Sequence, residues 1–210
     1  MTPVLVITID GPAAAGKSTT ARLLAGRLGL SFLDTGAMYR ALALKAIRQG
    51  IQDPSQIARI AEGTSIAVGE RVLLDGEDVT EAIRRPEITA AVRPIADAPL
   101  CRAQLVRMQR DARRAPGLVT EGRDQGSVVF PEADHKFYLD ARLEVRARRR
   151  HAQLGGDLAE VERSIARRDL EDRSRKVGPL VRPPGAVEID TSALTVEEVV
   201  ARMLAAIKGP

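Results

Sequence analysis

The sequence predicts an α/β protein built on a five-stranded parallel sheet flanked by helices, and two observations support this. Short apolar runs rich in β-branched residues show no alternation, which is typical of strands buried on both faces. Segments with helical periodicity separate these runs, and strands that alternate with helices form parallel sheets. The expected strands are residues 4–9, 31–33, 117–121, 136–139 and 187–189.

The length and composition predict a single domain over residues 1–210. The chain has 210 residues, of which 44% are hydrophobic, enough for one compact core. Residues 18–28 predict a helix that stops at Gly29, and Thr35 is expected to cap a helix that ends at Gly50. The other expected helices are residues 102–114, 143–150, 158–173 and 196–207.

Residues 63–95 interrupt the alternation of strands and helices. Residues 64–68 and 71–74 predict a hairpin, and Asp75-Gly76 predicts a turn after it. Three prolines punctuate the segment that follows the turn. We therefore expect a small β-containing insert at residues 63–95 of an otherwise regular chain.

Composition excludes several classes of protein. The chain has one Cys, Cys101, and two His, which argues against disulfide frameworks and Cys- or His-based metal sites. Aromatic residues make up 2% and Trp is absent, so platforms that stack nucleic-acid bases are not expected. No apolar stretch reaches the about 18 residues of a membrane span, and no basic signal-peptide region begins the chain. We expect a cytoplasmic monomer that binds neither nucleic acid nor membrane.

Residues 11–18 match the phosphate-binding loop pattern G-x-x-x-x-G-K-[ST]. The loop lies between an expected buried strand and an expected helix, whose positive end favours phosphate. In this motif Lys17 bridges the β- and γ-phosphates, and the Ser18 hydroxyl binds Mg²⁺. The expected ATP-binding residues are Gly11, Pro12, Ala13, Ala14, Ala15, Gly16, Lys17, Ser18 and Thr19.

The loop alone does not distinguish kinases from other nucleotide-binding proteins. The N-K-x-D string of guanine-binding switches does not occur. Small size and a net charge of +4, carried mainly by Arg, favour a kinase that phosphorylates an anionic acceptor. A kinase for another acceptor such as UMP, and a regulatory or nucleic-acid-binding module, are the alternatives.

Four further strings resemble the bacterial cytidylate kinase family, at compatible spacing over nearly the whole chain. They are I-T-I-D-G-P at residues 7–12, which leads into the loop, L-D-T-G-A-M-Y-R at residues 33–40, E-G-R-D-Q-G with V-V-F-P at residues 121–131, and R-D-L-E-D-R-S-R at residues 168–175. The resemblance implies a P-loop kinase that transfers phosphate from ATP to CMP, and to dCMP, in a direct in-line step with Mg²⁺. It also implies that residues 63–95 serve the acceptor.

The resemblance assigns the acceptor phosphate to Arg40 and Arg123, and arginine forks suit this task because they neutralise and orient two phosphates. Asp124 is expected to accept from the N4 amino group of cytosine and to repel O4 of uracil. Glu121 is expected to orient water on Mg²⁺. The expected CMP-binding residues are Thr35, Arg40, Arg102, Arg123, Asp124, Arg168, Asp172 and Arg175.

Gly155-Gly156 separates two Arg-rich helical segments, which suits a mobile lid over about residues 150–172. The lid-side candidates are Arg146, Arg149, Arg168 and Arg175, and the expected catalytic residues are Lys17, Arg40, Arg123 and Arg149. One position departs from the family, because Arg93 stands where a Ser commonly helps to hold the ribose.

Overall fold

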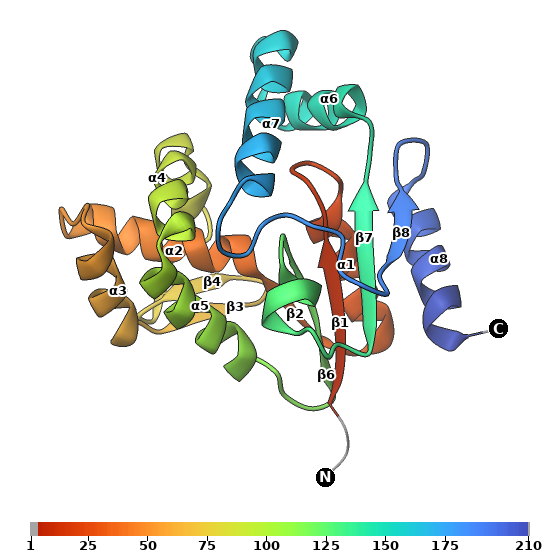
Figure 1. Cartoon of the computed structure of the whole chain (residues 1–210), viewed down its shortest axis with the longest axis horizontal. Coiled ribbons are helices and arrows are strands. Elements are labelled where there is room, and N and C mark those ends of the chain that lie inside the picture. Colours follow the sequence, from red (N-terminus) through yellow and green to blue (C-terminus); the bar gives the residue numbers. More distant parts are fainter. Residues whose placement is uncertain (1–3, 210) are drawn as a thin grey trace. The chain divides into compact units, whose positions relative to one another are not determined.

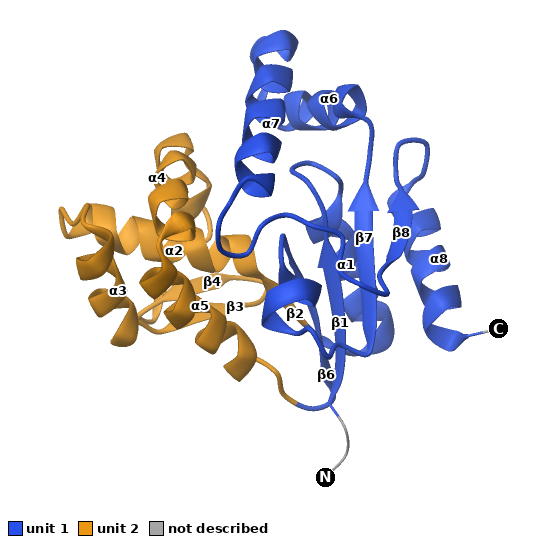
Figure 2. Ribbon diagram, in the orientation of Figure 1, with its two compact units in different colours: residues 1–31, 115–210 blue, residues 32–114 orange. Residues whose placement is uncertain are grey.

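The computed structural model describes residues 4–209, and the chain forms two compact units (Figure 2). Unit 1 comprises residues 1–31 and 115–210, and unit 2 comprises residues 32–114. Within residues 4–209, no helix combines the length and the apolar character needed to cross a membrane.

A five-stranded sheet has the strand order β2-β6-β1-β7-β8. Strand β1 pairs in parallel with β6 and β7, and β7 pairs in parallel with β8, as predicted (Figure 1). At β2 the chain passes from unit 1 into unit 2. The strands are β1 (Leu5–Asp10), β2 (Ser31–Asp34), β6 (Gly117–Gly122), β7 (His135–Asp140) and β8 (Val187–Asp190).

The helices of unit 1 lie on the sheet and beyond its carboxyl end. Helix α1 packs against β6 and α8, while α6 packs against α7 beyond the carboxyl end of β7 (Figure 1). Ile7, Phe137 and Leu139 are almost inaccessible to solvent and form the core of the central strands. The helices are α1 (Lys17–Leu28), α6 (Leu143–Leu154), α7 (Leu158–Arg173) and α8 (Val196–Lys208).

Unit 2 combines helices with a three-stranded sheet of order β3-β4-β5. Both strand pairs of this sheet are antiparallel, so the expected hairpin is confirmed and a third strand follows its turn. The elements are α2 (Thr35–Arg48), α3 (Pro54–Glu62), β3 (Ile66–Val68), β4 (Val72–Leu74), β5 (Glu77–Asp78), a 3₁₀ turn (Ala82–Arg84), α4 (Pro86–Asp97) and α5 (Pro99–Asp111).

Two local expectations in unit 2 are wrong. Asp34, not Thr35, caps α2: its Oδ1 accepts from the backbone N–H of Ala37, and Thr35 is already helical. The three prolines after the Asp75-Gly76 turn do not interrupt the structure. Pro86 and Pro99 occupy the first turn of α4 and α5, where the N–H that proline lacks would have no partner in the helix, and Pro94 lies inside α4. The insert expected at residues 63–95 lies within unit 2, and its role in binding an acceptor stays a prediction.

Candidate active site

Residues 11–16 form a loop that joins β1 to α1, and the last two residues of the phosphate-binding pattern, Lys17 and Ser18, begin α1 (Figure 1). Gly11 has φ 150°, and a Cβ there would lie 2.0 Å from the carbonyl oxygen of Leu139, so a side chain cannot be accommodated. Gly16 has φ 91° and is the left-handed N-cap of α1, without a side-chain cap. The loop therefore leads into the uncapped positive end of a helix, the arrangement that binds phosphate.

Lys17 is buried at the start of α1, and its Nζ donates to the carbonyl oxygen of Pro12 at 2.8 Å. Burial, together with the nearby Arg123 guanidinium, lowers the pKa of Lys17 to about 7. Two cations this close repel each other in a dry site, and a polyanion between them would stabilise both. The charge arrangement therefore favours a phosphate ligand.

Ser18 and Glu121 bring two oxygen atoms together beside the loop. The Ser18 hydroxyl donates to Glu121 Oε1 at 2.6 Å. Hydroxyl and carboxylate oxygens suit Mg²⁺, which keeps several waters and takes further ligands from phosphates. Among the described residues, no group of three or more His, Cys, Asp or Glu side chains could hold a metal ion. The donor set thus fits a Mg²⁺ bound mainly through nucleotide phosphates and water.

Arg123 follows β6 and is held by Asp172 of α7. Its Nε donates to Asp172 Oδ2 at 2.7 Å, and Arg175 Nη2 donates to Asp172 Oδ1 at 2.5 Å. Burial alone would raise the pKa of Asp172, but the two guanidinium groups hold it below its usual value. Burial likewise opposes the charge on Arg123, yet Asp172 holds its pKa above the usual value. The carboxylate thus holds two predicted CMP ligands, Arg123 and Arg175, in place.

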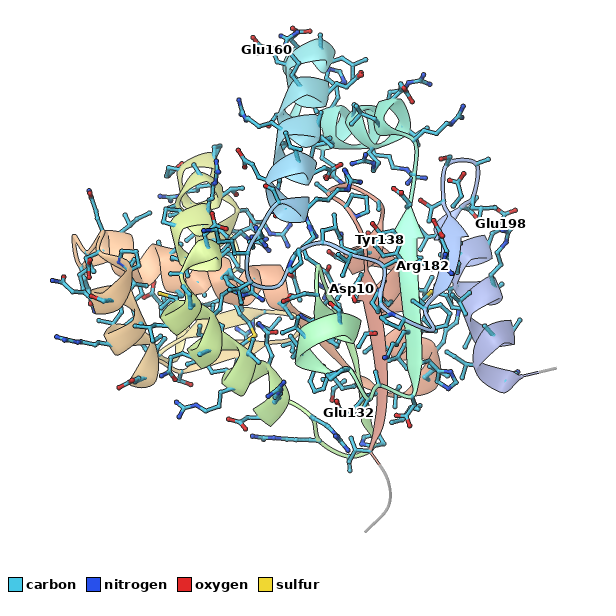
Figure 3. All side chains as sticks on the ribbon, in the orientation of Figure 1. Asp10, Glu132, Tyr138, Glu160, Arg182 and Glu198 are labelled. Atoms are coloured by element: carbon cyan, nitrogen blue, oxygen red, sulfur yellow. The ribbon has the colours of Figure 1, made fainter. Side chains whose placement is uncertain are left out.

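Asp124 is buried at the start of a short π-helix (Gln125–Val129), and Asp10 fixes that start. The Asp10 side chain is inaccessible at the end of β1 (Figure 3), where its two oxygens accept from the N–H groups of Gln125 and Gly126, both at 2.8 Å. Burial raises the pKa of Asp10 to about 7 despite these bonds. No role for Asp10 was predicted from the sequence, although a lone acid that ends an apolar strand was a usable signal.

Three further acceptor candidates, Thr35, Arg40 and Arg102, belong to unit 2. Arg40 Nη2 lies 3.3 Å from Asp34 Oδ2, and buried Arg102 donates from Nη1 to the Tyr39 hydroxyl at 3.1 Å. Thr35 is also buried. Thr35, Arg40 and Tyr39 all lie in the first two turns of α2, and Arg102 lies in the first turn of α5.

The lid candidates differ in their surroundings. Arg146 is buried and paired with Asp169, whereas Arg168 is exposed. Arg149 Nη1 donates to the Thr191 hydroxyl at 3.0 Å and its Nη2 to the Thr191 carbonyl oxygen at 2.6 Å. Neither Asp169 nor Thr191 was identified from the sequence.

Arg93 is exposed on α4, with its Nε 3.5 Å from Asp97 Oδ2. Its charged end is thus engaged by a neighbour one turn along the same helix.

A phosphate loop at the carboxyl end of the central parallel strand, with a buried lysine and a nearby arginine, defines a P-loop kinase. The shikimate kinase from Bacteroides thetaiotaomicron has a similar fold, with a TM-score of 0.53, 15% identity, and coverage of 99% of this chain and 100% of that one. The shikimate kinase from Acinetobacter baumannii, solved with shikimate, also gives 0.53, at 19% identity and coverage of 99% and 94%. At this identity the likeness concerns the fold alone.

The sequence comparisons identify the family. The cytidylate kinase family model matches residues 7–209. The cytidylate kinase of Symbiobacterium thermophilum is 51% identical over 95% of this chain and 94% of its own length. The cytidylate kinase of Caldanaerobacter subterraneus is 48% identical over 96% and 94%. The chain belongs to the cytidylate kinase family, and it is a phosphotransferase enzyme.

Proposed function

We propose that the protein transfers the terminal phosphoryl group of ATP directly to CMP, and also to dCMP, in one in-line step. One observation carries this proposal. Lys17, expected at the donor phosphates, and Arg123, expected at the acceptor phosphate, lie close enough for Arg123 to lower the pKa of Lys17. For direct transfer, the cation that binds the donor phosphates must lie close to the cation that binds the acceptor phosphate. Positioning of the two phosphates and neutralisation of their charge supply most of the catalysis.

On the donor side, residues 11–19 bind the ATP phosphates, with backbone N–H groups donated by loop residues other than Pro12, which has none, and Ala13, whose N–H is taken by Asp169. Lys17 contacts the β- and γ-phosphates. Ser18 would hold Mg²⁺, with Glu121 acting through a bound water; the 2.6 Å hydrogen bond between them supports this pairing. When bound, Mg²⁺ neutralises charge on the β- and γ-phosphate oxygens. Arg149, on α6, is proposed to contact the transferring group once the lid closes.

On the acceptor side, Arg123 and Arg40 bind the CMP phosphate. Arg123 suits this role because Asp172 orients its Nε, while its Nη1 donates only a long hydrogen bond of 3.4 Å to the Gly122 carbonyl oxygen. Arg40, Thr35 and Arg102 are proposed CMP ligands in unit 2, by residue-by-residue likeness to the family. Arg168, whose charge also acts on Lys17, is proposed to join them from α7.

Base selection rests on Asp124. A buried carboxylate accepts from the N4 amino group of cytosine and repels the O4 acceptor of uracil. Its backbone is fixed by the two amides that Asp10 holds directly after it. The sugar is proposed to contact Asp172 and Arg175, and both CMP and dCMP are expected to react.

The test is an assay of ADP formation with CMP, dCMP, UMP, AMP and GMP at equal concentrations. We expect the highest kcat/KM for CMP, with dCMP within about tenfold and UMP at least about a hundredfold lower. A preference for UMP or a purine monophosphate would overturn the assignment of Asp124. ADP release that does not depend on any monophosphate would overturn phosphoryl transfer to CMP.

We also propose that the enzyme works as a cytoplasmic monomer. Its single cysteine, Cys101, is a buried free thiol, which suits a reducing compartment. Light scattering after gel filtration should give the mass of one 210-residue chain, and a dimer mass would contradict the proposal.

A further inference from the structure

The backbone of Ala13, in the middle of the phosphate loop, is held at both its N–H and its carbonyl group. The N–H donates to Asp169 Oδ1 at 3.2 Å, and Arg146 Nη1 donates to the carbonyl oxygen, also at 3.2 Å. Arg146 and Asp169 form an ion pair with each other, and Arg146 Nε donates to the Ala141 carbonyl oxygen at 2.8 Å. One buried pair therefore connects α6, α7, the phosphate loop and the end of β7.

Apart from this ion pair, helices α6 and α7 contact the phosphate loop through few apolar side chains. Their buried apolar residues are Ala147 and Ile165, which form a small cluster with Ala13, and the partly buried Ala14, Leu143 and Val161 pack against it. Segments with few buried apolar contacts move at low free-energy cost. Arg149 also anchors α6 to Thr191, and Asp172 anchors α7 to Arg123, but the contact of both helices with the phosphate loop runs through the Arg146–Asp169 pair and this small cluster.

The buried positions of α7 lie on one face of the helix, at Ile165, Asp169 and Asp172. Asp169 contacts the loop, and Asp172, one turn further on, holds Arg123 through a 2.7 Å hydrogen bond. Any shift of α7 that follows a change at Ala13 must move Asp172 with it, because a helical turn transmits displacement almost rigidly. A buried ion pair adds little net stability, so stability alone does not explain the presence of the Arg146–Asp169 pair.

We propose that the Arg146–Asp169 pair is a positioning device that couples phosphate-loop occupancy to the placement of Arg123. When phosphates fix the loop backbone at Ala13, the pair fixes α7, and Asp172 then holds Arg123 ready for an acceptor phosphate. Neither residue touches a reacting atom. The inference rests on the proposed role of Arg123 in binding CMP. Linkage makes the coupling reciprocal, so CMP strengthens ATP binding by the same factor.

The experiment measures the affinity of CMP by calorimetry, with and without a saturating, non-hydrolysable β,γ-imido analogue of ATP and Mg²⁺. For the wild-type protein we expect the analogue to tighten CMP binding at least about fivefold. In Asp169→Asn the Oδ1 acceptor for Ala13 remains but the charge facing Arg146 is lost. We expect this variant to reduce the coupling factor to within about twofold of one, while the affinity for CMP alone changes less than about threefold.

Two more variants make the test specific. Arg146→Lys keeps the charge, but a lysine cannot reach Asp169 and the carbonyl oxygens of Ala13 and Ala141 at once. This variant should therefore also lower the coupling factor. If Asp169→Asn does not fold, Arg146→Lys tests the proposal in its place. Glu188→Gln breaks the exposed Arg182–Glu188 ion pair of the same unit, 2.7 Å between Arg182 Nη1 and Glu188 Oε2, and should leave the coupling at its wild-type value.

A wild-type coupling factor of one, or an undiminished factor in the folded Asp169→Asn or Arg146→Lys protein, would overturn the inference. So would an equal loss of coupling in Glu188→Gln, because the effect would then follow from any lost ion pair. Failure of the wild-type protein to bind CMP at all would overturn the proposed function instead. Far-UV circular dichroism and thermal melting of each variant separate loss of coupling from loss of fold.

Discussion

Helices α7 and α8 belong to the same unit, yet they bury opposite kinds of side chain. The buried residues of α8 are Val199, Val200 and Met203, and those of α7 are Ile165, Asp169 and Asp172. An apolar face stabilises a fold, whereas buried carboxylates carry a desolvation cost that must be offset by partners. The difference indicates that α8 serves stability, whereas the buried carboxylates of α7 serve the phosphate loop and Arg123, to which they are hydrogen-bonded.

The largest effect on activity is expected from the loss of another buried charge at the carboxyl end of the sheet, that of Lys17. Lys17→Met should lower kcat by about 10³-fold, because no buried cation then stabilises the negative charge on the transferring phosphates. The ADP-formation assay measures this, and circular dichroism should show an unchanged fold. Activity within tenfold of wild type would contradict the role of Lys17.

The apolar face of α8 should behave in the opposite way. Met203→Ala removes an inaccessible side chain and should lower the free energy of unfolding by about 2–5 kcal/mol. Urea unfolding measures this loss. The kcat at a temperature well below the melting transition should stay within about twofold of wild type. A large drop in kcat of the folded variant would show that α8 also serves the site.

The buried charge of Lys17 should also make the stability of the folded protein depend on pH. The pKa of Lys17 is lowered to about 7 from an ordinary value of 10.5, so the unfolded chain binds the proton more tightly. The buried ammonium therefore destabilises the ligand-free fold fully below pH 7, and this penalty disappears as pH rises from 7 towards 10.5. Lys17→Met should melt several degrees higher than wild type at pH 6, with a difference that shrinks by pH 10. A constant difference across this range would contradict the lowered pKa.

Asp124→Asn tests a buried charge that is proposed to select a ligand. The carboxamide can donate to O4 of uracil, so the ratio of kcat/KM for CMP to that for UMP should fall about tenfold or more. Asp124→Glu, which keeps the charge, is the matched control and should still reject UMP. An unchanged ratio in Asp124→Asn would show that Asp124 does not read the base.

The smallest expected effect concerns the start of α8. Thr195 and Glu198 form a capping box, with Glu198 N–H donating to Thr195 Oγ1 at 3.2 Å. Thr195→Ala should lower the free energy of unfolding by about 1 kcal/mol without changing kcat, and Thr195→Ser should restore stability. Equal stability of Thr195→Ala and wild type would mean that water replaces the cap at no cost.

The sheet and the phosphate loop were predictable because their signals are local. The run at residues 4–9, the loop glycines and the leucines of α1 lie next to one another in the chain, so pattern and spacing suffice. Helices α3 and α4 were missed for the opposite reason. Pro54 and Pro86 each occupy the first turn of a helix, and a proline there has the same appearance in a sequence as a proline in a turn.

The candidate site was predictable where residue type determines the chemistry, as at Lys17. It was not predictable where a residue acts through distant backbone. Asp169 lies in a run of charged residues that resembles a solvated helix face, and its partners, Ala13 and Arg146, are far away in sequence. Asp10 likewise acts on amides more than a hundred positions away. The one sequence signal was the helical spacing of Ile165, Asp169 and Asp172, which places both carboxylates on the same face as a buried isoleucine.

The single thiol of Cys101 is shielded from solvent, at 0% exposure. A maleimide dye added to the folded protein therefore finds no native thiol to label. Ala152→Cys, at an exposed position near the end of α6, would supply one reactive thiol without removal of the native cysteine. A single environment-sensitive fluorophore at that position would report nucleotide-driven motion of α6 in real time.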